Sequence, residues 1–100
     1  MQFIIIGRDG TDSHAAERRK DMREAHLAQV EKAVQSGEQL MGAAMLNNNG
    51  DMTGSVMIVD FPDRIALDQW LENEPYVTGR VWQDIEVIPC KIPPVFLKNH

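Results

Sequence analysis

Cysteine is almost absent from this sequence, which holds a single one, Cys90, among its 100 residues. One cysteine forms neither an internal disulfide nor a cysteine zinc site, and such scarcity favours a reducing compartment. Long apolar runs are absent too, since no segment approaches the roughly 20 residues that a helix needs to cross a bilayer. The opening stretch, MQFIIIGRDG, has four consecutive apolar residues, fewer than the core of a secretory signal needs. We therefore expect a cytoplasmic protein with no membrane partner.

Basic residues are also scarce. Lysine and arginine number 10 against 15 aspartates and glutamates, which gives a net charge of −5 at pH 7. An acidic chain is a poor non-specific binder of nucleic acid, so we expect a small-molecule ligand instead. The sequence contains no phosphate-binding loop and no GxGxxG, HExxH or GxSxG motif. No residues have metal-ligand spacing, so we expect neither a metal nor another cofactor.

Apolar residues make up 43% of the chain, and this length fits one domain over residues 1–100. The apolar periodicity and the turn residues predict elements in the order β-α-β-β-α-β. Asn49 and Gly50 predict a hairpin turn between the second and third strands. Residues 75–80 are expected to form a loop or a single turn, and residues 91–100 an extended tail. The predicted strands are 2–7, 38–47, 52–61 and 81–90, and the predicted helices are 14–36 and 64–73.

This order of elements is typical of the ferredoxin-like α+β fold, in which two helices cover one face of a four-stranded antiparallel sheet. Both crossovers should be right-handed, which places both helices on the same face. The strands are nevertheless apolar on both faces, as the consecutive residues 4–6 and 56–59 show. An uncovered apolar face needs a partner. We therefore expect a second copy of the chain to pack there, in a homodimer or a higher homo-oligomer.

A histidine, His26, falls on the apolar stripe of the first predicted helix, and Arg23 falls at the edge of that stripe. A single histidine there is commonly a core residue with one satisfied nitrogen, and a single arginine commonly snorkels to solvent. The pair is more informative, because an unpaired buried charge is costly. An acceptor or an anion should therefore lie nearby, and Asp9 and Glu74 are the two candidate carboxylates.

Asp9 is the preferred partner of His26, because the first strand leads directly into this helix. His26 nevertheless lies about twelve residues beyond residue 14, or roughly 18 Å of helical rise. Asp9 reaches His26 more easily if the helix begins near Arg18 or later. If the helix begins at residue 14, Glu74 or a group of a partner chain is the more accessible acceptor.

The sequence resembles the YciI-like family (YCII-related domain) of small bacterial proteins over nearly its full length. The resemblance rests on Asp9 after the first strand, the R-x-x-H of REAHL (23–27) and the stretch GEQLMGAAM (37–45). It continues through three further segments, TGSVMIVDF (53–61), LDQWLENEPY (67–76) and IEVIPCKI (85–92).

The family implies a ferredoxin-like fold paired into a dimeric α/β barrel, with an active site built on a histidine and an aspartate. His26 and Asp9 match those two positions. The family often has Asp-Pro-Tyr before the last strand, whereas this chain has Glu74, Pro75 and Tyr76. The glutamate keeps the charge and adds one methylene, which changes how the carboxylate is placed. The stretch GAAM also lacks a proline that is often found there.

We therefore predict a cofactor-free enzyme of the lyase, dehydrochlorinase or isomerase type. The resemblance implies this class because a similar protein, which takes part in the degradation of chlorinated aromatics, dehydrochlorinates a hydroxyquinol. His26 would be the general acid/base, because imidazole titrates at roughly pH 6.5. Asp9 would hold its tautomer, and Arg23 would bind an anionic group. The fold alone does not decide function, so a non-catalytic dimeric ligand-binding or interaction protein is the alternative. The other predicted site residues are Glu74, Ser55 and Tyr76.

Overall fold

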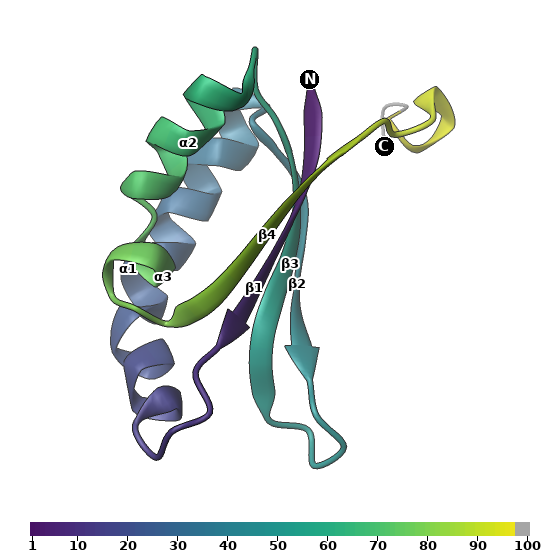
Figure 1. The fold of residues 1–100 in the computed structure, drawn as a ribbon. Helices are drawn as coiled ribbons and strands as arrows, with labels where there is room; N and C mark the ends of the chain where they lie inside the picture. Colours follow the sequence, from purple (N-terminus) through teal and green to yellow (C-terminus); the bar gives the residue numbers. More distant parts are fainter. Residues whose placement is uncertain (98–100) are drawn as a thin grey trace.

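The computed structural model describes residues 1–97 and confirms the ferredoxin-like fold. The sheet has four strands in the order β2-β3-β1-β4, and every neighbouring pair is antiparallel. The three α-helices lie together on one face of this sheet (Figure 1). The strands are β1 (Gln2–Asp9), β2 (Gln39–Leu46), β3 (Met52–Asp60) and β4 (Trp82–Cys90); the helices are α1 (Ala15–Ser36), α2 (Arg64–Glu72) and α3 (Pro75–Thr78), followed by the 3-10 turn η1 (Pro94–Phe96).

The ends of the helices follow from their capping residues. Helix α1 ends at Ser36 and is followed by Gly37, which has the left-handed conformation (φ 82°) that glycine adopts without strain. Helix α2 begins after Asp63, whose carboxylate accepts a hydrogen bond from the N–H of Ala66. The single turn expected within residues 75–80 is α3. These boundaries lie within a few residues of the predicted ones, because the capping signals are local.

Two details differ from the predictions. In the hairpin between β2 and β3, Gly50 has a positive φ of 84°, whereas Asn49 does not have a positive φ. The side chain of Asn47 stabilises the turn, because its Oδ1 accepts hydrogen bonds from the backbone N–H groups of Asn49 and Asp51. The tail is not extended throughout, because residues 94–96 form η1. Pro94 suits the first position of a helical turn, where no N–H is needed. The end of the predicted tail, residues 98–100, lies outside the described residues.

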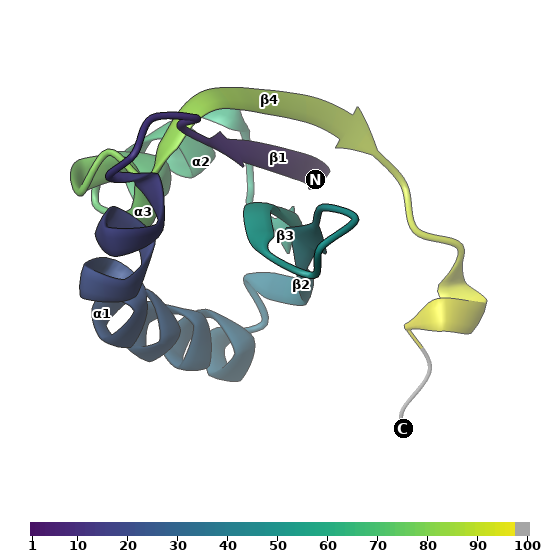
Figure 2. The same ribbon diagram turned by 90° about the horizontal axis from the view of Figure 1, so that it is seen from below.

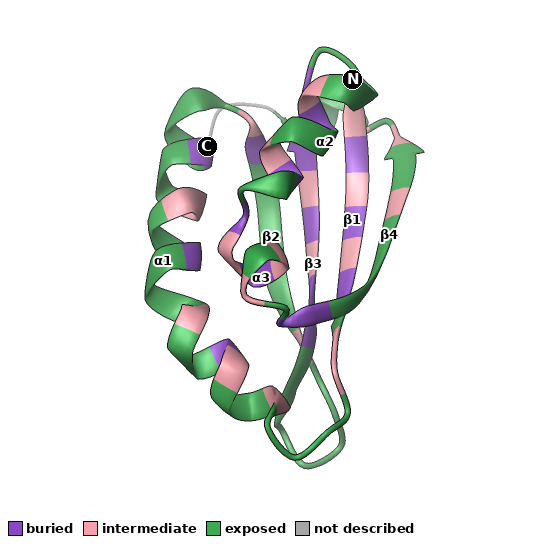
Figure 3. Cartoon of the chain, turned by 60° about the vertical axis from the view of Figure 1, so that its left-hand side comes forward, coloured by how far each residue is buried: buried purple, intermediate pink, exposed green. Residues whose placement is uncertain are grey.

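The core lies between the sheet and the helices. Buried residues alternate with less buried ones along much of β1 and β3 (Figure 3), as expected for strands that have one face against the helices. Phe3 and Ile5 of β1 are buried there, with Val59 of β3. Trp82, at the start of β4, packs flat against the backbone of Gly7. A Cβ atom at Gly7 would lie 2.3 Å from the indole ring, so glycine is required for Trp82 to sit there.

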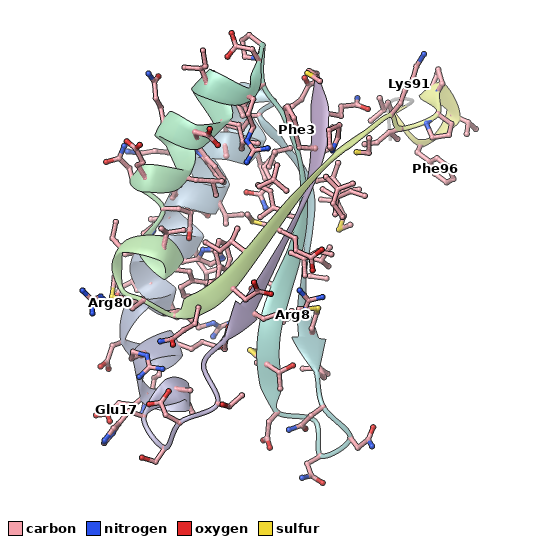
Figure 4. All side chains as sticks on the ribbon, in the orientation of Figure 1. Phe3, Arg8, Glu17, Arg80, Lys91 and Phe96 are labelled. Carbon is pink, nitrogen blue, oxygen red and sulfur yellow. The ribbon has the colours of Figure 1, made fainter. Side chains whose placement is uncertain are left out.

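The opposite face of the sheet is apolar and carries no helix. Ile4 pairs with Ile58 on one side and with Ile88 on the other, so these three side chains share this face. Residues 91–97 run away from the sheet on this side (Figures 1 and 2). Phe96, labelled in Figure 4, is 69% exposed. Among residues 1–97, no helix is long and apolar enough to span a membrane.

Candidate functional site

A cavity of about 320 Å³ lies between α1 and the strands β2 and β3. Helix α1 contributes both charged and apolar residues to its wall, β2 contributes mainly small and apolar ones, and α3 contributes one aromatic ring. The wall consists of Arg19, Arg23, His26, Leu27, Val30 and Val34 of α1, residues 39–44 of β2, Met52, Ser55, Val56 and Met57 of β3, and Tyr76 of α3.

His26 is bound to a buried carboxylate. Its Nδ1 lies 2.5 Å from Oε1 of Glu74, and the other oxygen of Glu74 accepts the backbone N–H of Tyr76 at 2.8 Å. The His26 ring also stacks on the Tyr76 ring, with the centroids 3.8 Å apart and the planes 5° from parallel. A carboxylate oxygen accepts hydrogen bonds, which assigns the donor role in this contact to Nδ1. Nε2 is therefore the nitrogen that remains for a ligand.

The predicted pairing of His26 with Asp9 is wrong, and the alternative, Glu74, is the partner. Helix α1 begins at Ala15, so His26 lies about three turns into the helix, whereas Asp9 precedes its start. Glu74 lies just beyond α2, which ends at Glu72. It is the residue before α3, where its carboxylate caps the helix and reaches toward α1.

Asp9 forms a buried ion pair with Arg19. The Nε and Nη2 atoms of Arg19 donate to the two oxygens of Asp9 at 2.6 and 3.1 Å, and the side chains are 9% and 5% exposed. Burial lowers the pKa of Arg19, but the hydrogen bond and charge of Asp9, together with smaller contributions from Tyr76, outweigh burial and raise that pKa above its usual value. Sequence reasoning missed Arg19, although its position two turns before His26 places both residues on one face of the helix.

Ser55 joins this ion pair to the aromatic residues. Its Oγ accepts from Nη2 of Arg19 at 2.9 Å and from the indole N–H of Trp82 at 3.2 Å. Both lone pairs of the hydroxyl are thereby used, and its hydrogen is left to donate elsewhere. The guanidinium carbon of Arg19 lies 4.8 Å from the centroid of the Tyr76 ring, within the range of a cation–π contact. Trp82, a core residue, therefore also orients Ser55.

The charged side chains in the cavity wall are all basic. Arg19, Arg23 and His26 line the cavity, whereas no lining residue is an aspartate or glutamate. Within residues 1–97, no carboxylate lies within ion-pair distance of Arg23, and Asp9 and Glu74 are each occupied by another partner. In a chain with net charge −5, this arrangement favours an anionic ligand.

The Tyr76 side chain is buried in the same wall. Burial raises the pKa of its phenol above the usual value, and the positive charges of Arg19 and Arg23 offset only part of that rise. Tyr76 is therefore neutral at physiological pH. Of the six predicted site residues, the structure places His26, Arg23, Ser55 and Tyr76 in the cavity wall and places the two carboxylates behind it.

Known proteins are similar to this chain in sequence and in structure. The family model described as YCII-related domain matches residues 1–91. Protein YciI of Escherichia coli O6:H1 (strain CFT073) is 33% identical over 97 residues, which cover 91% of this chain and 97% of that protein.

Two solved structures have a similar fold. The first is 5-chloro-2-hydroxyhydroquinone dehydrochlorinase (TftG) from Burkholderia phenoliruptrix AC1100, in complex with 2,5-dihydroxybenzoquinone. It matches with a TM-score of 0.80 and 25% identity, over 95% of this chain and 98% of that chain. A crystal structure of an antibiotic biosynthesis monooxygenase matches with a TM-score of 0.53 and 23% identity, over 93% of this chain and 100% of that chain, and shows the fold alone.

Proposed function

This chain belongs to the YCII-related domain family, and we propose that it is a small-molecule enzyme of the lyase or isomerase type that uses its own side chains for proton transfer. The observation that carries the proposal is the buried contact between His26 and Glu74 beside a cavity that is also lined by two arginines. The structural similarity to TftG, a dehydrochlorinase, supports this class of function.

In the proposed reaction, Nε2 of His26 removes a proton from a carbon or a hydroxyl of the substrate. The electron pair moves to a substrate oxygen, where Arg19 and Arg23 stabilise the negative charge. The Glu74 carboxylate stabilises the imidazolium that forms. In an isomerisation, His26 returns the proton to a different atom. In an elimination, the electron pair returns from the oxygen and expels a leaving group such as chloride, and the His26 imidazolium then releases its proton to solvent.

The two carboxylates have different roles in this mechanism. Glu74 holds the tautomer and the orientation of His26, which is the role expected for Asp9 from the sequence. Asp9 instead holds the Arg19 guanidinium through Nε and Nη2. This leaves Nη1, which contacts the sulfur of Met52 at 3.9 Å, to bind substrate. Both are positioning residues, because neither lines the cavity.

Turnover of hydroxylated and chlorinated aromatic compounds tests the proposal. Wild-type protein should release chloride or change the ultraviolet absorbance of at least one compound, and His26→Ala should abolish this. His14→Ala is the matched control, because His14 is exposed before α1. A protein that binds such compounds with no turnover, or whose turnover survives His26→Ala, would favour the non-catalytic alternative.

We also propose that two copies of the chain pair through the sheet face opposite the helices. The apolar side chains on that face, with Ile88 40% exposed and Phe96 of the tail 69% exposed, support a second copy as the partner. Sedimentation in dilute solution should give a mass about twice 11.3 kDa. A folded monomer would overturn this proposal. The cytoplasmic location stays a prediction.

A further inference from the structure

The cavity follows helix α1 for most of the length of the helix. The α1 residues in its wall run from Arg19 to Val34, and the helix rises about 22 Å over these fifteen positions. Each residue turns about 100° around a helix, so all six of these side chains fall within an arc of about 100°. The cavity is therefore elongated along one side of α1.

Small residues of β2 make room for the cavity. Ser55 and Met57 of β3 are buried on the sheet face that meets the helices, and their partners in β2 are Ala44 and Gly42. Directly paired residues of neighbouring strands share a face of the sheet, and both of these β2 residues line the cavity. A methyl group and a hydrogen atom thus face α1 where larger side chains would fill the space.

The α1 wall changes in polarity along the helix axis. Every charged residue of the wall comes before position 27, and every α1 residue of the wall from position 27 onward is apolar. The basic end consists of Arg19, Arg23 and His26, and the apolar end consists of Leu27, Val30 and Val34. A ligand that complements both ends is an anion with an apolar chain.

The apolar end is open to water. Leu27 is 44% exposed and Val34 is 57% exposed, although both line the cavity. Exposed apolar side chains along a cavity are typical of a ligand-binding surface, because contact with an apolar ligand removes them from water. The pairing of two copies proposed above uses the opposite face of the sheet, so it leaves this end of the cavity open.

We propose that the cavity binds an anion with a linear apolar chain, with the anionic group at the basic end and the chain along the apolar end. The place of the anionic group beside His26 rests on the function proposed above, and the chain extends that proposal. Helix α1 rises about 12 Å from His26 to Val34. An extended chain advances about 1.2 Å per single bond, so a chain of about ten bonds reaches Val34. The substrate class is then a carboxylate or phenolate with an alkyl chain of this length.

Calorimetric titration with butanoate, hexanoate, octanoate and decanoate tests the proposed chain directly. Complete burial of one methylene is worth about fourfold in affinity. The cavity is open on one side, so we expect about twofold to threefold for each methylene from butanoate to decanoate. Decanamide has nearly the same chain but no charge, and it should bind about tenfold more weakly than decanoate, because it loses charge-assisted hydrogen bonds.

Three variants locate the two parts of the ligand. Val34→Asn places a polar group at the far apolar end, so it should weaken decanoate by about threefold or more and leave butanoate, which does not reach it, unchanged. Arg23→Gln should weaken all four carboxylates by one common factor. Ile65→Asn is the matched control, because Ile65 is a 70% exposed residue of α2 outside the cavity wall, and it should bind as wild type does.

Sedimentation separates a ligand from a second copy of the chain as the occupant of the apolar end. Val34→Asn should sediment as wild type does, whereas a fall in mass would assign this end to a partner copy and overturn the inference. Equal affinity for butanoate and decanoate, no binding of either, or a decanoate affinity that Val34→Asn leaves unchanged would overturn it too.

The binding measurements need no turnover, so they separate this inference from the proposed function. Affinity that rises with chain length in a protein without turnover would refute the proposed function alone. Turnover that requires His26, in a protein that does not distinguish the four carboxylates, would refute this inference alone.

Discussion

Replacing Asp9 by asparagine should destabilise the fold far more than the same exchange in a surface ion pair. The Asp9 and Arg19 side chains are 5% and 9% exposed, and Asp9 accepts two of the hydrogen bonds of the guanidinium. Asparagine leaves that guanidinium charged and buried without a counter-ion. Breaking a buried pair in this way costs about 3–5 kcal/mol. This is a large part of the roughly 5–15 kcal/mol that stabilises a typical domain.

Asp68→Asn is the matched control. Asp68 pairs with Arg64 at 2.8 Å, but both side chains are more than half exposed, and such pairs contribute no more than about 1 kcal/mol. Urea unfolding should show a clear fall in the midpoint for Asp9→Asn, by about 1 M or more for an m value of about 1–3 kcal/mol/M. The Asp68→Asn midpoint should barely change.

The double variant Asp9→Asn/Arg19→Met tests the electrostatic cause. It removes both charges, so it should be more stable than Asp9→Asn alone. The reasoning is refuted if Asp9→Asn costs no more than Asp68→Asn. It is also refuted if the double variant is less stable than the single one, because the lost contacts would then matter more than the unpaired charge.

The remaining predictions concern a titration, a turn and the His26 partner. Tyr76 is the single tyrosine, so its ionisation can be followed by tyrosinate absorbance, and its pKa should lie above 10 in the native protein and near 10 in the denatured one. The stability that the neutral, buried phenol contributes is therefore complete below pH 10 and is lost as the pH rises through the native pKa. Gly50→Val should lower the free energy of unfolding by about 1–2 kcal/mol, measured by thermal melting. The loss comes from backbone strain at φ 84° alone, because a Cβ atom there meets nothing within 4 Å, and unchanged melting would argue that the turn is loose. Glu74→Gln should lower kcat by about 10²- to 10⁴-fold, and turnover equal to wild type would remove Glu74 from the mechanism.

The fold was predictable because its signals are local. The apolar residues of β1 and β3, the Asn-Gly pair of the hairpin and Gly37 after α1 each specify an element or its end within a few residues of sequence. The apolar stripe of α1 likewise placed His26 on the buried side. The resemblance to a known family then fitted the same order of elements.

The pairings within the site were harder to predict, because they depend on how elements far apart in sequence pack. Asp9 lies 17 residues from His26 and Glu74 lies 48 residues away, yet Glu74 is the partner, because α3 turns it toward α1. Arg19 does have a sequence signal, because it precedes His26 by seven residues, or about two helical turns, and so lies on the same face of α1.

The location of the proton on the His26 ring tests the central claim most directly. Nitrogen NMR of isotope-labelled protein shows which nitrogen of a neutral imidazole ring carries the proton. The spectrum of His26→Asn lacks the His26 signals and so identifies them among those of the three histidines. Because Glu74 binds Nδ1, the remaining proton should reside on Nδ1, and Nε2 should be the basic nitrogen that responds to an anionic ligand in the cavity. A proton on Nε2, with Nδ1 unprotonated and Nε2 unaffected by ligand, would contradict a role for His26 as the base.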